Sequence, residues 1–131
     1  MSQSARILLC FAGLSLFVAT ALGAYASHGA ASAIGPASLE TLQTAIAYQF
    51  YNSLGLLAVG TLVQRYRDAI LLRVAGFVIL GGVVVFCGAV DAHSLGAPPV
   101  IGEFAPVGGT ALIAGWLIFA FGILKAPRPQ D

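Results

Sequence analysis

The sequence predicts an all-α integral membrane protein, a bundle of four transmembrane helices with both termini on the cytoplasmic side. Of the 131 residues, 59% are hydrophobic and 8% are charged, whereas about 25% are charged in an ordinary globular protein. The mean hydropathy is +0.94. The charged residues also stand between four long uncharged segments. Because this length is typical of one domain, we expect residues 1–131 to form a single membrane domain.

The same composition excludes two other classes of protein. A net charge of +1 is too small for a protein that binds the phosphates of a nucleic acid. The high hydrophobic content excludes intrinsic disorder. The lipid bilayer is therefore the first partner that the sequence implies.

The four helices are expected where segments without Asp, Glu, Lys or Arg are long enough to cross the bilayer. About 20 apolar residues span about 30 Å of hydrocarbon. The first uncharged segment, 7–39, is too long for one span, and small residues up to Gly35-Pro36 predict a loop inside it. We therefore expect helices near 6–27, 38–64, 70–91 and 105–125. The second is longer than a span requires, so it should tilt or protrude.

The basic residues predict the orientation of the bundle. In this arrangement one side carries all six of them: Arg6, Arg65, Arg67, Arg73, Lys125 and Arg128. The other side carries ionisable residues but no Lys or Arg: His28, Glu40, Asp91, His93 and Glu103. Since Lys and Arg remain in the cytoplasm, both termini are predicted to be cytoplasmic. A cleaved signal peptide ending at Ala24-Tyr25-Ala26 is the alternative for the first segment, but its apolar run is longer than usual.

Small residues predict where the helices pack, because they let two backbones approach closely in lipid. The first helix has four of them at four-residue spacing, and glycines recur in the third and fourth helices. The residues expected at helix contacts are Ser15, Ala19, Gly23, Ser27, Gly81, Gly88, Gly108, Gly109 and Gly115. These stripes are interpreted as part of the fold, with an interface between copies or subunits as the alternative.

Two groups of polar residues are candidates for a functional site. His28, Asp91 and His93 lie on the side without basic residues and carry donors that a transition metal or a proton relay would use. Asp91 and His93 converge only if the helix unwinds between them, so a solvated rim is the main interpretation. Tyr48, Gln49 and Asn52 form a polar face on the second helix. This face is interpreted as hydrogen bonding between helices, with a ligand pocket as the alternative.

Several short motifs occur in a defined order along the chain: Leu22–His28, Gln43–Ala45 with Tyr48-Gln49, Phe86 with Gly88, Pro106–Gly109, and Ala114–Trp116. Taken together they resemble the YgdD-like family of small four-span membrane proteins, which is related to animal transmembrane protein 256. The resemblance implies a bacterial inner-membrane protein of a family without an established biochemical function. The chain departs from the family pattern at Asn52, where a His is usual, at Ala105, where a Thr is usual, and over 87–91.

The sequence contains no catalytic or phosphate-binding motif, so neither an enzyme nor a cofactor is expected. The leading hypothesis is a non-enzymatic accessory subunit or assembly partner that binds other membrane subunits or its own copies. One alternative is a protein that binds or transports a lipid, a quinone or a neutral solute, and another is a metal-binding protein. No carboxylate is expected inside the four uncharged segments, which argues against a proton-coupled antiporter.

Overall fold

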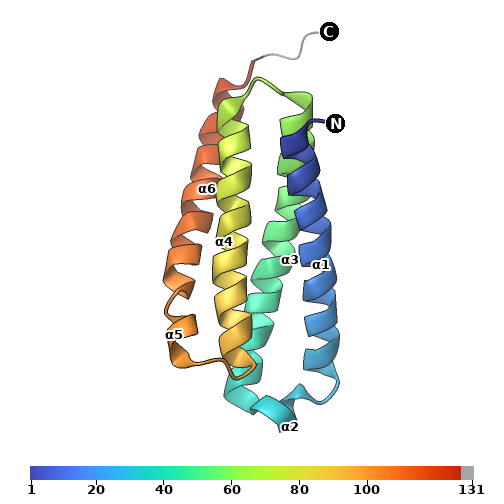
Figure 1. Ribbon diagram of the computed structural model, residues 1–131, viewed down its shortest axis with the longest axis vertical. Helices are drawn as coiled ribbons and strands as arrows, with labels where there is room; N and C mark the ends of the chain where they lie inside the picture. The colour runs from blue at the N-terminus through green and yellow to red at the C-terminus, as the bar shows by residue number, and fades with distance from the viewer. Residues whose placement is uncertain (128–131) are drawn as a thin grey trace.

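The computed structural model describes residues 1–127, and within them it confirms the predicted four-span helical bundle (Figure 1). The long helices are α1 (Gln3–Ser27), α3 (Pro36–Arg65), α4 (Ile70–Ser94) and α6 (Ala105–Lys125). Their ends lie within three residues of the ranges expected from the sequence. Two short helices, α2 (Ala30–Ile34) and α5 (Pro99–Gly102), occupy connections between the long ones.

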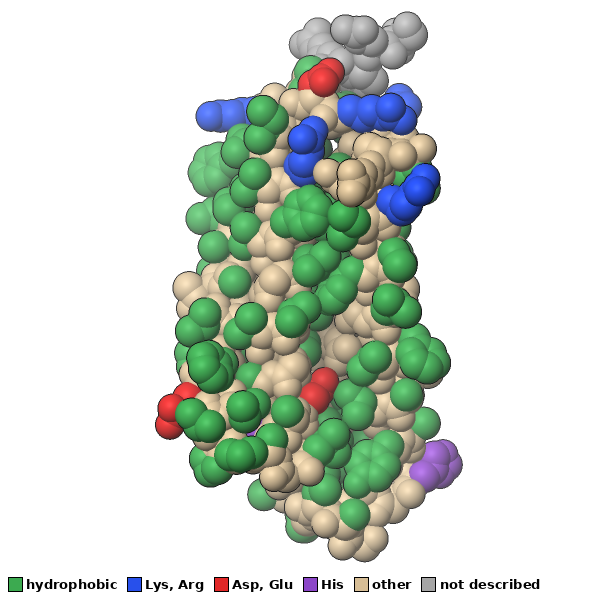
Figure 2. Space-filling model, viewed as in Figure 1, with side chains coloured by type: hydrophobic (Ala, Val, Ile, Leu, Met, Phe, Trp, Pro, Cys, Tyr) green, Lys and Arg blue, Asp and Glu red, His purple; other side chains and the backbone are tan. Residues whose placement is uncertain are grey.

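The two ends of the bundle differ in charge. The helix α1 begins, and α6 ends, at the same end as the turn between α3 and α4 (Figure 1). Figure 2 shows Lys and Arg side chains gathered at this end, which we call the basic end. The connections that contain α2 and α5 lie at the other end, called here the opposite end. Arg128, the sixth basic residue, lies outside the described residues.

Local signals define where the helices begin. The hydroxyl of Ser2 caps α1 by accepting a hydrogen bond from the backbone N–H of Ala5 at 3.2 Å. The backbone N–H of Ser2 donates to Oε1 of Gln64 at 2.7 Å, which ties the start of α1 to the end of α3. Pro36 occupies the first turn of α3 after Gly35, whose φ of +84° favours glycine.

The helices are neighbours in the order α1, α3, α4, α6. The helix α1 packs along α3, α3 packs along α4, and α4 packs along α6, whereas α1 and α4 touch over a short stretch. Near the basic end Leu8 of α1 fits over Gly76 of α4, where a Cβ would lie 2.6 Å from Cδ1 of Leu8. The helix α3 therefore forms the floor between α1 and α4.

The contact between α4 and α6 depends on four glycines: Gly82, Gly108, Gly115 and Gly122. A Cβ at Gly108 would overlap the backbone nitrogen of Phe86. A Cβ at Gly115 would lie 2.6 Å from Cγ1 of Ile79. We call these four residues the glycine seam. In lipid, where apolar surfaces gain nothing by leaving water, this close van der Waals packing holds the pair together.

Most of the predicted packing residues lie at helix contacts or are buried, and Ser27 is an exception. Gly108 and Gly115 lie in the glycine seam, Gly109 makes an ordinary contact with the Phe86 ring, and Ser15 and Ala19 are buried. Gly23 lies at van der Waals distance from Ile46, whereas Ser27 is exposed and its hydroxyl donates to the carbonyl of Gly23.

The interpretation of Gly81 and Gly88 as contacts inside the bundle is wrong, because no atom of the described residues lies within 4 Å of where their Cβ atoms would be. Each residue turns a helix by about 100°, and the rotation of α4 directs Gly82, not Gly81, at α6.

Candidate functional site

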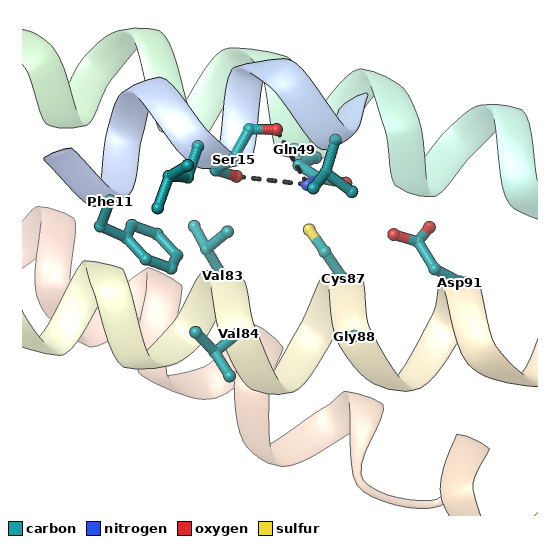
Figure 3. A pocket seen from close by; sticks show the side chains of 10 residues that line it. Phe11, Ser15, Gln49, Val83, Val84, Cys87, Gly88 and Asp91 are labelled. Atoms are coloured by element: carbon teal, nitrogen blue, oxygen red, sulfur yellow. Dashed lines mark hydrogen bonds between the residues drawn. The ribbon is translucent and has the colours of Figure 1, made fainter. Parts of the chain in front are cut away.

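A groove of about 300 Å³ lies between α1 and α4, with α3 as its floor (Figure 3). Its rim includes Leu14, Val18 and Val84, which are exposed on the surface that faces lipid. We call it the α1/α4 groove, and it is lined by Phe11, Leu14, Ser15, Val18, Gln49, Val83, Val84, Cys87, Gly88 and Asp91. The walls are therefore mostly apolar, with a few polar groups toward the floor and the opposite end.

A hydrogen-bonded group at mid-depth fixes the floor of the groove. Nε2 of Gln49 donates to the backbone carbonyl of Ser15 at 3.1 Å and to its hydroxyl at 3.2 Å. The hydroxyl of Ser53 donates to the Ser15 hydroxyl at 2.7 Å. Because a carbonyl can only accept, the amide nitrogen of Gln49 must face α1. This orientation turns Oε1 of Gln49 away from Ser15.

Oε1 of Gln49 has no hydrogen-bond partner among the described residues, although the side chain is only 5% exposed. An unsatisfied polar group in hydrocarbon costs several kcal/mol. Buried acceptors in proteins are nearly always paired. The α1/α4 groove thus contains a buried acceptor that lacks a donor.

Asp91 supplies a second such acceptor. The helix α4 continues through this residue to Ser94, so the end of the uncharged segment at Val90 does not mark the end of the helix. Asp91 lies one turn beyond Cys87, a rise of about 6 Å, and lines the same groove. Its Oδ1 is buried without a partner among the described residues. Asp91 thus follows the uncharged segment but lies within α4, a helix long and apolar enough to cross a membrane.

The structure does not bring His28, Asp91 and His93 together. Since α4 stays helical, Asp91 and His93 are about 200° apart around its axis. Asp91 faces the groove, while His93 packs over Gly102 of α5 and His28 is exposed at the end of α1. Among residues 1–127, no three His, Cys, Asp or Glu side chains are grouped as a metal site requires. A metal centre built from this set has no geometric basis.

The polar face expected on α3 is divided between two sides of the helix. Gln49 faces α1, whereas Asn52 faces α6: its Oδ1 accepts from Nε1 of Trp116 at 2.8 Å, and its Nδ2 donates to the carbonyl of Tyr48 at 2.8 Å. The Trp116 ring crosses Gly55, where a Cβ would lie 2.5 Å from Cη2 of the ring. Asn52 therefore forms a hydrogen bond between helices, as predicted for the polar face of α3.

A second cavity of about 480 Å³ lies on this other side, between α3 and α6. Tyr48, Asn52, Phe86 and Trp116 are among the residues that line it. Within the described part of the chain, none of the buried side-chain oxygen or nitrogen atoms of its wall lacks a hydrogen-bond partner. It therefore offers shape and aromatic surface, but no polar atom that requires a ligand.

Sequence reasoning placed Ser53 on the polar face of the second helix, assigned Ser15 to packing alone and gave Cys87 no place in a site. A signal for the serines exists in the sequence. In two antiparallel helices, residues at the same depth have numbers with a nearly constant sum, and Ser15 with Gln49 or Ser53 satisfies this for α1 and α3. Polar residues at matching depth predict a hydrogen-bonded pair. No comparable signal points to Cys87, because its position depends on the rotation of α4.

Comparisons with known proteins agree with the resemblance inferred from the sequence. Residues 22–109 match the family described as "Protein of unknown function (DUF423)". The UPF0382 inner membrane protein YgdD of Escherichia coli K12 is 29% identical over 126 residues, 96% of this chain and 95% of that protein. A UPF0382 membrane protein of Haemophilus influenzae is 31% identical over 118 residues, 90% of this chain and 94% of that protein.

A relative from Bacillus subtilis, the UPF0382 membrane protein YwdK, is 26% identical over 120 residues, covering 92% of this chain and 98% of that protein. No solved structure matches the chain significantly. The region matched by the family contains Gln49, Cys87 and Asp91, whereas the part of α1 from Phe11 to Val18 precedes it.

Proposed function

The chain belongs to the DUF423 family of membrane proteins, and we propose that it binds a small amphipathic ligand in the α1/α4 groove. The observation that carries this proposal is the buried Oε1 of Gln49 at the floor of the groove, for which residues 1–127 supply no hydrogen-bond donor. A donor atom on a ligand would remove the cost of leaving this acceptor unpaired. Apolar walls with a few convergent polar groups are typical of small-molecule sites, and about 300 Å³ is the lower end of their usual size.

The proposal includes an orientation in a bacterial inner membrane. Following the tendency of Lys and Arg to remain inside, the basic end and both termini are assigned to the cytoplasm. Ser15 is the middle residue of α1, so its partner Gln49 lies near the centre of the bilayer. Asp91 then lies between the centre and the outer surface. A ligand would enter sideways from the lipid, because the groove opens between α1 and α4.

We assign the groove a role in binding or transport, not in catalysis. The Cys87 thiol is the one strong nucleophile among the described residues of its wall. No His or Lys of that wall accompanies the thiol to activate it.

Native mass spectrometry of protein released from source membranes in mild detergent tests this function. The unaltered chain should retain a recurrent small-molecule adduct, and Gln49→Leu should lose at least nine-tenths of it. Gln43→Leu is the matched control, because Gln43 lies on the same helix and is exposed. Equal adducts on all three chains, or none on any, would contradict the proposal.

A second candidate function, the accessory subunit, is favoured by a different observation. Gly81 and Gly88 lie seven residues apart on α4, with open space around both. Such a face suits close docking of a helix from another membrane protein or a second copy. Native gel electrophoresis should then show the chain in a defined larger complex, which Gly81→Leu should dissociate, because Gly81 lies outside the lining of the α1/α4 groove. Migration as a single chain in both cases would exclude this candidate and leave the ligand proposal intact.

A further inference from the structure

We infer that the polar part of the ligand is a protonated primary amine, held between Gln49 and Asp91 in the α1/α4 groove. This inference rests on the proposed function of the groove as a ligand site. It specifies the chemical class of the ligand and assigns Asp91 the role of its counter-ion.

The hydrogen bonds around the groove indicate which polar groups a ligand must supply. Nε2 of Gln49 and the hydroxyl of Ser53 both donate to Ser15, so neither of these two donors is available to serve another acceptor in the groove. Among the described residues, three buried side-chain atoms have no hydrogen-bond partner, and two of them belong to residues that line the groove: Oε1 of Gln49 and Oδ1 of Asp91. Both of these are acceptors, whereas the third, Oγ of Ser94, lies outside the lining. Figure 3 shows the side chains of Gln49 and Asp91 facing the same stretch of groove from α3 and α4. The missing groups are therefore donors.

The charge of the groove favours a cationic ligand. Among the described residues that line the groove, Asp91 is the one charged side chain. The Lys and Arg residues of α1, α3, α4 and α6 lie toward the basic end, away from Asp91. A carboxylate in a membrane-facing site is normally paired, because burying an unpaired charge is costly. A ligand that brings both a positive charge and N–H donors satisfies both requirements.

The shape of the groove favours an amine with an apolar chain. A primary ammonium group has three donors, which is enough to serve Gln49 and Asp91 together. From this polar position toward the basic end the walls are apolar, formed by Val83, Val84, Leu14 and Phe11. An amine with one alkyl chain therefore fits with its head toward the opposite end and its chain toward the basic end. Two sources offer this chemistry: a free amphiphilic amine, and the ethanolamine headgroup of a phospholipid.

The test compares two probes on the whole chain in nanodiscs of phosphatidylcholine. Dodecylamine and dodecanol share the same alkyl chain and differ in the charged head. We expect dodecylamine to bind at least ten times more tightly than dodecanol, measured by native mass spectrometry of occupancy against concentration. Asp91→Asn should abolish this preference, whereas Glu103→Gln, which neutralises an exposed acid near the same end, should preserve it.

The outcomes separate this inference from the function on which it rests. Equal binding of the two probes to the unaltered chain, lost in Gln49→Leu, would overturn the amine and retain the ligand site. Binding that is indifferent to Gln49→Leu would overturn both. The comparison of probes in the unaltered chain requires no variant, so it decides the question even if Asp91→Asn does not fold.

Replacing part of the phosphatidylcholine by phosphatidylethanolamine distinguishes the two sources of the amine. Competition with dodecylamine supports the lipid headgroup as the occupant. Undiminished dodecylamine binding supports a free amine. Both outcomes support a primary ammonium ligand, and they differ in the molecule that carries it.

Discussion

The helix α4 packs closely against α6 on one side and only in part against α1 on the other. Toward α6, the glycine seam brings the two backbones into contact. Toward α1, contact is limited to the stretch near Gly76 and Leu8, and farther along α4 presents Val83, Cys87 and Asp91 to a groove. Helices in lipid associate through close packing and hydrogen bonds and not through the exclusion of water. Glycines set in register therefore close the side toward α6, whereas on the side toward α1 the close contact is limited to Gly76 and the groove beyond it is open.

The largest effect on stability is expected at Gly108. Its Cβ would meet the backbone of Phe86, which cannot move without displacing α4. Overpacking typically costs about 1–3 kcal/mol, and Gly108→Ala should lie at the top of this range. The neighbouring Gly109→Ala is the control, because its Cβ would lie 3.7 Å from the Phe86 ring. The measurement is thermal unfolding in detergent, monitored by the fluorescence of Trp116. Equal melting temperatures for Gly108→Ala and Gly109→Ala would refute the close approach of α6 to the backbone of α4.

A smaller effect is expected at Gly82. A Cβ there would lie 2.8 Å from Cδ2 of Leu112, at the flexible end of a side chain, and 3.0 Å from its backbone nitrogen. Gly82→Ala should destabilise the protein by about 1–2 kcal/mol. Gly81→Ala meets nothing within 4 Å and should be neutral, or stabilising by up to about 1 kcal/mol through helix propensity. If Gly81→Ala proves the more harmful variant under the same unfolding assay, the rotation of α4 described above is incorrect.

The hydrogen bond between Trp116 and Asn52 should contribute less than either glycine. Hydrogen bonds between membrane helices average about 0.6 kcal/mol, with a maximum of about 1.7 kcal/mol. A double-mutant cycle of Trp116→Phe and Asn52→Leu, measured by reversible unfolding, should give a coupling energy within that range. A coupling energy of zero would mean that α6 does not depend on this bond to α3.

The smallest effect is expected on the groove side, at Ser53. Ser53→Ala removes the donor to the Ser15 hydroxyl, but Gln49 continues to hold Ser15 from the other side. A loss of about 0.6 kcal/mol is expected. The control is Thr61→Ala, since the Thr61 hydroxyl bonds only its own helix at the carbonyl of Leu57. A loss above about 2 kcal/mol would show that Ser53 stabilises the groove floor more than a single bond of this kind does.

The sequence predicts the fold well, because its composition and its uncharged segments reflect the surrounding lipid and not the details of how the helices pack. It predicts the presence of glycine contacts but not their face. Gly81 and Gly82 are both compatible with a stripe, and the rotation of α4 against α6 decides between them. The split of Gln49 and Asn52 has a similar origin, because α3 contacts helices on two sides. The sequence predicts Asp91 at a solvated rim because the uncharged segment ends before this residue. In the structure the helix α4 continues past it to Ser94.

The groove and its contents depend on a finer property, the pairing of individual atoms. Gln49 is easily recognised as a polar residue in a membrane helix. Only the structure shows that its amide nitrogen donates to Ser15, while its oxygen has no partner in the part of the chain that is described. Sequence patterns report residue types, whereas a ligand responds to the atoms that remain unpaired after the helices have packed.

The most direct test of the α1/α4 groove as a ligand site is a high-resolution structure of the chain purified with its native lipids. Density for an elongated molecule should occupy the groove, with a donor atom at hydrogen-bond distance, about 2.7–3.2 Å, from Oε1 of Gln49. A groove closed by movement of α1 against α4, with Oε1 paired to a donor of the chain itself, would contradict the account.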